Sequence, residues 1–243
     1  MIYQTFIRTI PGRKLFAILI DPEGLSPGEL RKIIQVADAQ EVDWILIGGS
    51  LISEPLDGPI ELIKSLTGIP VVLFPGSLWQ LSTKADAILL LSLISGRNPE
   101  HLIGNHVLAA PILKKSTLEI ISTSYILTGQ ADQTAVGYMS HSRPIPDHKT
   151  DLVVATAQAG ELLGHKLTYL EAGSGAQQAI SAATISAVRK SISIPLIVGG
   201  GIKSESDADA VYAAGADMIV IGNAIEKKTG LIRKIAGLRS KYT

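Results

Sequence analysis

Three glycine-marked strand ends stand close together in the last third of the chain: Tyr169-Leu-Glu-Ala-Gly-Ser-Gly-Ala176, Val198-Gly-Gly-Gly-Ile202 and Val220-Ile-Gly-Asn-Ala224. Each closes an apolar run typical of a buried parallel strand, and each precedes a helix-like segment. Glycine lets backbone N–H groups approach a ligand closely, and a helix N-terminus favours negative charge. The three ends together predict a phosphate-binding cradle. In an eight-stranded α/β barrel such a cradle lies at the C-terminal rim, where barrel enzymes hold their active sites.

Apolar runs of strand length recur along the whole chain. We expect eight strands, at Leu15–Ile20, Trp44–Ile47, Val71–Phe74, Ala87–Leu91, Leu118–Ile121, Leu167–Leu170, Ile194–Val198 and Met218–Ile221. The runs are near-continuous rather than alternating, as expected when helices cover a parallel sheet. Helix-period segments lie between most of them, most clearly at Ser26–Gln40, Asp151–Leu163, Gln178–Lys190 and Ser204–Ala214. This alternation predicts a single α/β domain over residues 1–243, a (βα)8 TIM barrel.

The composition limits the class of protein. The chain has 243 residues, 46% of them hydrophobic and 18% charged, which suits one barrel with a large core. Lysine plus arginine equals aspartate plus glutamate, 22 each, so nothing favours nucleic acid or an anionic membrane as the main partner. The lack of cysteine excludes disulfides and thiolate chemistry. No run reaches the ~18 apolar residues of a membrane span and residues 1–14 show no signal peptide, so we expect a cytoplasmic protein without an integral membrane segment.

One βα repeat is defective. Only twelve residues separate Phe74 from Ala87, and they include Pro75, Gly76 and Trp79. A full helix with two loops does not fit there, so we expect a modified barrel whose third helix is missing or reduced. The gap should expose apolar surface that could bind a long apolar ligand or a partner subunit. Such a trough would be floored by residues of the third and fourth strands.

A long segment from Tyr125 to Thr150 follows the fifth predicted strand. It contains two glycines, two prolines and the cluster His141-Ser-Arg-Pro-Ile-Pro146. Loops of this length tend to be functional, and the position after a strand places this one over the rim.

Two residues at the ends of the first strands are candidates for metal binding. Asp21 ends the first strand in Leu-Ile-Asp-Pro, and Ser50 ends the second in Gly-Gly-Ser. Mg²⁺ binds through one or two carboxylates together with phosphate oxygens of a substrate, so Asp21 could be a ligand and Ser50 could add a hydroxyl. The alternatives are a turn or helix-capping aspartate and an N-cap serine.

Glu171 is the strongest candidate for proton transfer. It ends the sixth strand, and the period of two places it on one face with Tyr169. A carboxylate at the inner rim is costly to bury unless it has a partner or a task. Glu171 could bind a substrate hydroxyl or accept its proton.

Several other chemistries lack support. No lysine lies inside a predicted strand, which disfavours a Schiff-base aldolase. The five histidines show no zinc-binding spacing, and there is no Gly-x-Ser-x-Gly elbow.

Taken together, the motifs resemble the geranylgeranylglyceryl phosphate synthase family, which includes heptaprenylglyceryl phosphate synthase relatives. The resemblance runs the whole length in order. It rests on Leu-Ile-Asp-Pro at 19–22, Gly-Gly-Ser at 48–50, Tyr-Met-Ser-x-x-Arg-Pro-Ile-Pro at 138–146, the octet at 169–176, Val-Gly-Gly-Gly-Ile at 198–202 and Gly-Asn at 222–223. The octet together with 138–146 is highly specific, whereas the glycine turns alone are not. The family is known as a barrel with a degenerate third helix, which agrees with the short connection between Phe74 and Ala87 in this sequence.

The resemblance implies a prenyltransferase of phospholipid biosynthesis. It would join a prenyl diphosphate, with geranylgeranyl (C20) the expected donor, to the C3 hydroxyl of sn-glycerol 1-phosphate. Asp21 and Ser50 would hold Mg²⁺ against the donor diphosphate, and Glu171 would contact the glycerol hydroxyl, which makes Asp21 and Glu171 the catalytic candidates. The acceptor would bind at Tyr169, Leu170, Glu171, Ala172, Gly173, Ser174, Gly175, Gly200, Gly201, Gly222 and Asn223. The family also implies a homo-oligomer, a dimer or larger.

One position departs from the family pattern. Many relatives carry a basic residue two positions after the Asp-Pro pair, where this chain has Gly24. Lys14 or Arg143 are the candidate replacements. Two other functions stay open on the sequence alone: another phosphate-binding barrel enzyme acting on a sugar phosphate or flavin-linked substrate, and a non-catalytic phosphate-binding barrel. The second would not need Asp21 and Glu171 to face one pocket.

Overall fold

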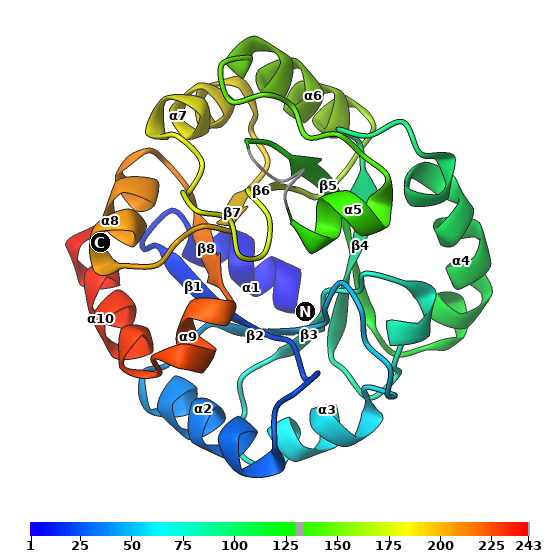
Figure 1. Cartoon of the computed structure of the whole chain (residues 1–243), viewed down its shortest axis with the longest axis vertical. Helices are drawn as coiled ribbons and strands as arrows, with labels where there is room; N and C mark the ends of the chain where they lie inside the picture. Colours follow the sequence, from blue (N-terminus) through cyan, green and yellow to red (C-terminus); the bar gives the residue numbers. More distant parts are fainter. Residues whose placement is uncertain (130–133, 243) are drawn as a thin grey trace.

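Eight parallel strands close into a barrel in the order β1 to β8, so the predicted TIM barrel is confirmed (Figure 1). The computed structural model describes residues 1–129 and 134–242. The strands are β1 (Leu15–Ile20), β2 (Trp44–Ile47), β3 (Val71–Leu73), β4 (Ala87–Leu93), β5 (Glu119–Leu127), β6 (Leu167–Glu171), β7 (Leu196–Gly199) and β8 (Met218–Ile221).

Helices form an outer ring that covers the outward faces of the strands (Figure 1). The helices of the described residues, including those at the ends of the barrel, are α1 (Ile2–Thr9), α2 (Pro27–Ala39), α3 (Asp57–Lys64), α4 (Asn105–Lys115), α5 (Ala135–Ser140), α6 (Thr150–Leu162), α7 (Ala182–Ser191), α8 (Glu205–Ala213), α9 (Asn223–Lys227) and α10 (Gly230–Leu238). Short turns are η1 (Leu78–Gln80), η2 (Glu100–Gly104) and η4 (Arg239–Tyr242). No helix in the part of the chain that the structure describes is long and apolar enough to cross a membrane.

The connection between β3 and β4 confirms the reduced third helix. Where the other repeats have a helix, this one has only the three-residue turn η1. The turn packs against α4, the helix of the next repeat. Trp79 of η1 is 90% exposed, because no helix covers this part of the wall.

Strand β5 is longer than the sequence predicts. It continues past Ile121 to Leu127, although Thr123 and Ser124 interrupt the apolar run. Both polar side chains are buried and satisfied: the Thr123 hydroxyl donates to Ile121 O at 2.9 Å, and the Ser124 hydroxyl pairs with Nδ1 of His165 at 2.6 Å. Two buried hydroxyls with partners are therefore compatible with a central strand, which the apolar pattern alone does not reveal.

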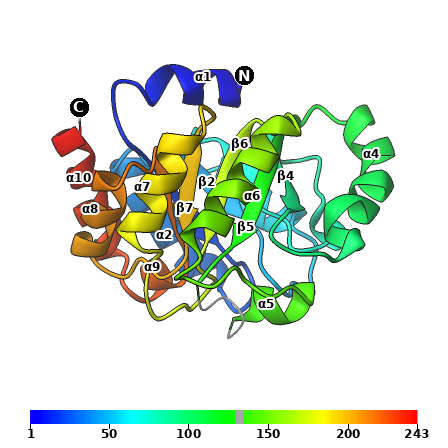
Figure 2. The same ribbon diagram turned by 90° about the horizontal axis from the view of Figure 1, so that it is seen from above.

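Helix α7 begins later than predicted, at Ala182 rather than Gln178. Ser181 caps it by accepting the N–H of Thr184 at 3.2 Å. Residues 172–181 consequently form a long loop over the barrel mouth. The segment after β5 also crosses the rim as expected, and α5 lies at this end of the barrel (Figure 2). Positions 130–133 of that segment lie outside the described residues.

The alternation of strand residues divides the core into two layers. One layer fills the barrel interior, and the other lies between the strands and the helices. At the end of the interior nearest the C-terminal rim, the rings of Phe74, Tyr125 and Tyr169 pack together, with centroids 5.1 to 5.7 Å apart. This aromatic floor separates the barrel core from the rim.

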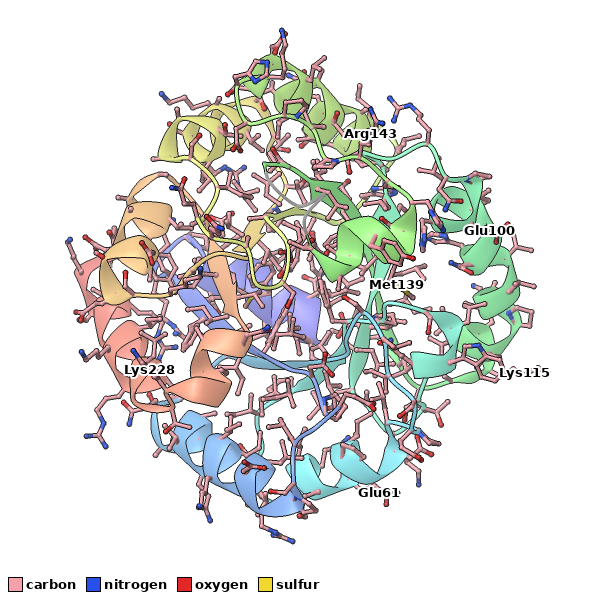
Figure 3. The ribbon with its side chains drawn as sticks, in the orientation of Figure 1. Glu61, Glu100, Lys115, Met139, Arg143 and Lys228 are labelled. Atoms are coloured by element: carbon pink, nitrogen blue, oxygen red, sulfur yellow. The ribbon has the colours of Figure 1, made fainter. Side chains whose placement is uncertain are left out.

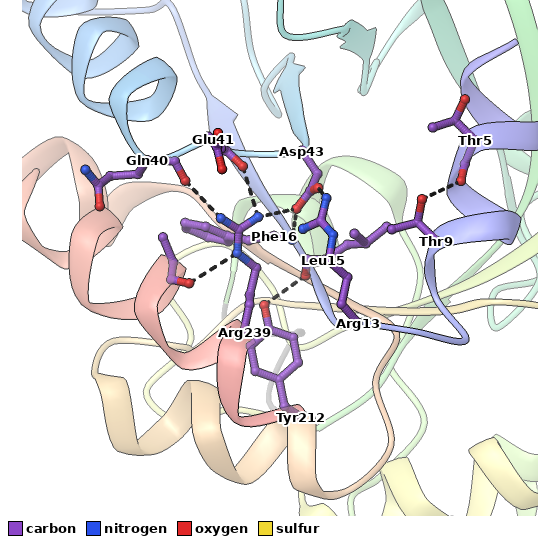
Figure 4. Close-up of polar contacts among 11 residues, drawn as sticks. Thr5, Thr9, Arg13, Leu15, Phe16, Gln40, Glu41, Asp43, Tyr212 and Arg239 are labelled. Carbon is purple, nitrogen blue, oxygen red and sulfur yellow. Dashed lines mark hydrogen bonds and ion pairs between the residues drawn. The ribbon is translucent and has the colours of Figure 1, made fainter. Parts of the chain in front are cut away.

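The opposite end of the barrel is closed by helix α1, which lies across it (Figure 2). Phe6 of α1 packs on Trp44 inside the barrel, with ring centroids 4.9 Å apart. Beside it, Asp43 accepts hydrogen bonds from Arg13 Nη2 at 2.6 Å and Arg239 Nη1 at 2.7 Å (Figure 4). This cluster ties the C-terminal end of the chain to the start of the barrel.

Candidate active site

A cavity of about 860 Å³ opens at the C-terminal ends of the strands. Its wall brings together most of the residues that the sequence singled out, from five different strand ends. These are Asp21, Ser50, Tyr169, Glu171, Ser174, Gly175, Gly200, Gly201, Gly222 and Asn223. Asp21 and Glu171 therefore face one cavity, which a purely phosphate-binding barrel would not require.

Leu170, Ala172 and Gly173 are not part of the cavity wall. Leu170 points outward into the layer between strands and helices, because it alternates with Tyr169 and Glu171 along β6. Any contact of these three residues with a ligand would go through their backbone.

Glu171 is nearly enclosed, with 5% of its surface exposed. Its Oε1 accepts the N–H of Gly173 at 2.6 Å, and it forms no ion pair within the part of the chain that the structure describes. Burial raises the pKa of this carboxyl from 4.5 to about 7, although the Gly173 N–H and the hydroxyls of Tyr169 and Tyr125 act in the opposite direction. A carboxyl with such a pKa can exchange a proton near neutral pH.

Tyr125 is a site residue that sequence reasoning missed. It lies on β5 in register with Tyr169 of β6, and its side chain joins the aromatic floor beneath Glu171. The burial of both rings and the charge of Glu171 raise the pKa of each phenol well above 10. The signal was available only by extending the strand through Thr123 and Ser124, since the period of two then puts Tyr125 inside the barrel.

The Tyr169 hydroxyl is fully buried and has no hydrogen-bond partner of regular geometry among the described residues. It is close enough to Glu171 to influence that carboxyl's pKa. A side chain at Gly199 would collide with it, since a Cβ there would lie 2.2 Å from the hydroxyl oxygen. An orphaned buried hydroxyl on the wall of a cavity is suited to bind a ligand there.

The glycine loops after β6 and β7 pack closely around Glu171. Gly200 has φ +79°, and a Cβ on it would lie 2.3 Å from Glu171 Oε1. The loops after β6 and β8 meet where the Ser174 hydroxyl donates to Asn223 Oδ1 at 3.1 Å. This cradle thus presents backbone groups and two small polar side chains to a ligand.

The expected contribution of helix N-termini is only partly present. Helix α7 begins at Ala182 and α8 at Glu205, so neither follows its glycine loop directly. Only Gly222 leads straight into a helix, the five-residue α9. For α7 the reason is the ten-residue loop after β6, which crosses the mouth before that helix starts; a shorter loop, residues 200–204, precedes α8.

Asp21 and Ser50 lie on the same side of the cavity. Asp21 is half-buried, and burial is the main cause that raises its pKa, partly offset by a hydrogen bond from the Glu23 N–H at 3.1 Å. A Cβ on Gly49 would lie only 2.4 Å from Asp21 Oδ2, so the loop with Ser50 packs directly on this carboxylate. One carboxylate and one hydroxyl fit Mg²⁺, which takes few protein oxygens when substrate phosphates complete its shell.

Neither expected replacement for a basic residue at Gly24 reaches the cavity. Lys14 precedes β1, near Asp217 at the opposite end of the barrel, and Arg143 lies at the outer rim beyond α5 (Figure 3). Lys203 and Lys228 line the cavity instead. Sequence reasoning missed both, because Lys203 after the Gly200-Gly201 turn and Lys228 after α9 stand at unremarkable loop positions.

The other arm of the cavity is apolar and occupies the place of the missing helix. Leu78 and Leu81 come from the region of η1, Ala109 comes from α4, and Ile88 and Leu90 come from the outward face of β4. The fourth strand thus floors the trough as expected, whereas no residue of β3 (Val71–Leu73) is part of the cavity wall and Phe74, which follows β3, lines the cavity from the aromatic floor. The trough joins the rim beside Asp21 and Ser50.

The model of the PcrB family matches residues 9–238, a range that includes every strand and every residue of this site. The chain belongs to the PcrB family. The chain is 51% identical to a protein named geranylgeranylglyceryl phosphate synthase from Chitinophaga pinensis, over 97% of this chain and 94% of the relative.

Solved structures also match the chain over nearly its whole length. Wild-type GGGPS from Thermoplasma volcanium has a TM-score of 0.94 and 35% identity, covering 100% of this chain and 99% of that one. The (S)-3-O-geranylgeranylglyceryl phosphate synthase from Thermoplasma acidophilum, solved with its substrate sn-glycerol-1-phosphate, has a TM-score of 0.94 and 32% identity, with 98% of each chain covered.

Proposed function

We propose that this PcrB-family chain transfers a prenyl group from a prenyl diphosphate to the C3 hydroxyl of sn-glycerol 1-phosphate. The observation that carries the proposal is the position of Glu171. This carboxylate has no cationic partner among the described residues and lies between a polar glycine cradle and an apolar trough within one cavity. The names and the bound substrate of the relatives support the same reaction.

The acceptor would occupy the glycine cradle. The phosphate would lie against the backbone at Gly200, Gly201 and Gly222, with the side chains of Ser174 and Asn223 beside it and the Asn223 amide as a donor. Glycerol hydroxyls would then point toward Glu171 and the orphaned Tyr169 hydroxyl. Holding the acceptor in this way places the C3 oxygen in line for attack, so that the entropic cost of orienting it is met on binding, before the chemical step.

The donor would occupy the other arm. Asp21 and Ser50 are the residues that would hold Mg²⁺ beside the diphosphate, where the ion supplies charge stabilisation for the leaving group. The apolar side chains of η1, β4 and α4 would enclose the prenyl tail. In the transfer, the C3 oxygen forms a bond to the allylic carbon, the bond from that carbon to the diphosphate oxygen breaks, and Glu171 takes the hydroxyl proton.

A product assay with glycerol 1-phosphate and a series of prenyl diphosphates tests the proposal. Each buried CH₂ is worth ~0.8 kcal/mol, so kcat/KM should rise steeply from a C10 to a C20 donor. C20 is the donor that we favour over C35. A flat series would contradict binding of the tail in the trough, and absence of product with every donor would reject the function itself.

We also propose that the enzyme is a cytoplasmic homo-oligomer. Helix α4 exposes Val107, Leu108 and Ile112, and the preceding turn η2 exposes Ile103; these side chains are 51% to 62% accessible in the isolated chain. An apolar stripe of this kind is unusual on a monomer, so a second copy of the chain would cover it. Sedimentation at micromolar concentration should give a dimer or larger species, and a monomer would contradict the assembly. Cell fractionation tests the compartment.

A further inference from the structure

The turn that replaces the third helix contains a buried polar side chain. Gln80 ends η1, and only 1% of it is exposed. Its Oε1 accepts the N–H of Gly49 at 3.2 Å and that of Gly76 at 3.0 Å, while its Nε2 donates to Gly49 O at 2.7 Å. One carboxamide therefore joins the loops that follow β2 and β3.

The two loops and Asp21 are packed without any side chain between them. A Cβ on Gly76 would lie 2.4 Å from Gly49 O, and a Cβ on Gly49 would lie 2.4 Å from Asp21 Oδ2. Any shift of Gly49 is thus a shift against the Asp21 carboxylate. Gln80 fixes the position of Gly49, because its carboxamide binds both the N–H and the C=O of that residue.

We propose that Gln80 is a positioning residue for the donor half of the reaction. It holds the loop with Ser50 against Asp21 and, through η1, sets that loop relative to the wall of the trough. The inference rests on the proposed donor site. Gln80 itself is not part of the cavity wall, so it acts through Gly49 and not by contact with substrate. The turn η1, which stands in place of the third helix, then aligns the diphosphate end of the donor with its prenyl tail.

The test compares Gln80→Glu with a matched control. The substitution keeps the shape and the acceptor oxygen but turns the donor facing Gly49 O into an oxygen. Ser82→Ala is the control, because Ser82 lies two residues further on, is 4% exposed, and pairs with Asp57 and the Lys84 N–H instead of the glycine loops. An unpaired buried carbonyl predicts a roughly 5- to 150-fold rise in KM for the donor and in the Mg²⁺ concentration for half-maximal rate.

Binding measurements separate positioning from general damage. Binding of an unreactive prenyl thiodiphosphate with Mg²⁺, followed by the fluorescence of exposed Trp79, should weaken as much as the donor KM rises. The calorimetric Kd for glycerol 1-phosphate should stay within about twofold, since the cradle after β6 to β8 does not touch Gln80. Ser82→Ala should leave both values unchanged. Equal weakening of donor and acceptor, or none, would overturn the proposal.

A second variant guards against a failure of Gln80→Glu to fold. Gly76→Ala keeps Gln80 but forces its loop away from Gly49 O, so it should give the same donor-specific loss. Normal donor affinity in Gly76→Ala would contradict a role for this loop contact. Inactivity of the wild-type chain with every donor would instead reject the proposed function, which keeps the two failures distinct.

Discussion

The carboxylates at the two ends of the barrel have opposite electrostatic environments. At the end closed by α1, Asp43 is paired with Arg13 and Arg239 and also accepts the N–H of Phe16 at 2.9 Å (Figure 4). At the rim, Glu171 is buried and Asp21 half-buried, neither forms an ion pair within residues 1–129 and 134–242, and burial raises the pKa of both. The carboxylate at the closed end is paired with arginines of the protein itself, whereas the two carboxylates at the rim can interact with ligands.

This difference has a cost in stability. A carboxyl whose pKa is raised on folding contributes its full stability below its unfolded pKa of 4.5 and loses it as pH rises through the folded value of about 7. For Glu171 the loss amounts to ~3 kcal/mol at alkaline pH. Such a penalty is expected at a site whose groups are arranged for reaction and not for folding.

The largest effect should come from Asp21→Asn. Removing the carboxylate that we assign to Mg²⁺ should lower turnover by roughly 10³-fold or more, because the leaving diphosphate loses several kcal/mol of charge stabilisation. Glycerol 1-phosphate should still bind. A product assay with calorimetry on the variant checks both statements, and near-normal turnover would remove Asp21 from the mechanism.

Glu171→Gln should reduce kcat by ~10²- to 10⁴-fold, the usual contribution of a general base. The same variant should be more stable than the wild type at pH 8, by up to ~3 kcal/mol, since it no longer buries a charge. Urea unfolding at pH 5 and pH 8 measures this gain, which should shrink at the lower pH. Loss of activity together with loss of stability would indicate a structural role.

At the closed end, Asp43→Ala should give the opposite result. Two arginines lose their shared partner, so the free energy of unfolding should fall by ~3–5 kcal/mol. The kcat/KM of the folded fraction at 25 °C should stay within about twofold of wild type, because the cluster lies at the far end from the cavity. A large change in kcat/KM without a change in stability would show that the two ends are coupled.

A smaller effect concerns the handedness of the acceptor. A fixed cradle and a fixed Glu171 read the configuration of the carbon between phosphate and hydroxyl. The wrong enantiomer, sn-glycerol 3-phosphate, should lose one charge-assisted hydrogen bond worth ~1.5–3 kcal/mol, or roughly 10- to 150-fold in kcat/KM. Equal rates for the two enantiomers would mean that Glu171 does not contact the acceptor.

The sequence predicted the barrel and most of the rim because both leave local patterns. Buried parallel strands read as apolar runs, and Asp21 and Glu171 stand at the ends of such runs beside glycine turns. Tyr125 was missed because two satisfied hydroxyls disguised the end of β5. A strand interrupted by polar residues cannot be extended with the apolar pattern alone.

Gln80 was missed for a different reason. Its function depends on backbone groups of Gly49 and Gly76, and the first of these comes from a neighbouring repeat. A lone glutamine in a short connection carries no periodicity that would reveal such contacts. The length of the connection between the third and fourth strands predicted that a helix is missing there. The proposed role of the turn that replaces it could be inferred only from the contacts of Gln80 with Gly49 and Gly76 in the structure.

The pH dependence of kcat/KM tests the central claim most directly, namely that Glu171, buried without a cationic partner among the described residues, accepts the acceptor's proton. Wild type should lose activity as pH falls through about 7, with one inflection there. Asp43→Ala should keep this inflection, and the residual activity of Glu171→Gln should lack it. A wild-type profile that is flat between about pH 5.5 and 8.5 would contradict the account.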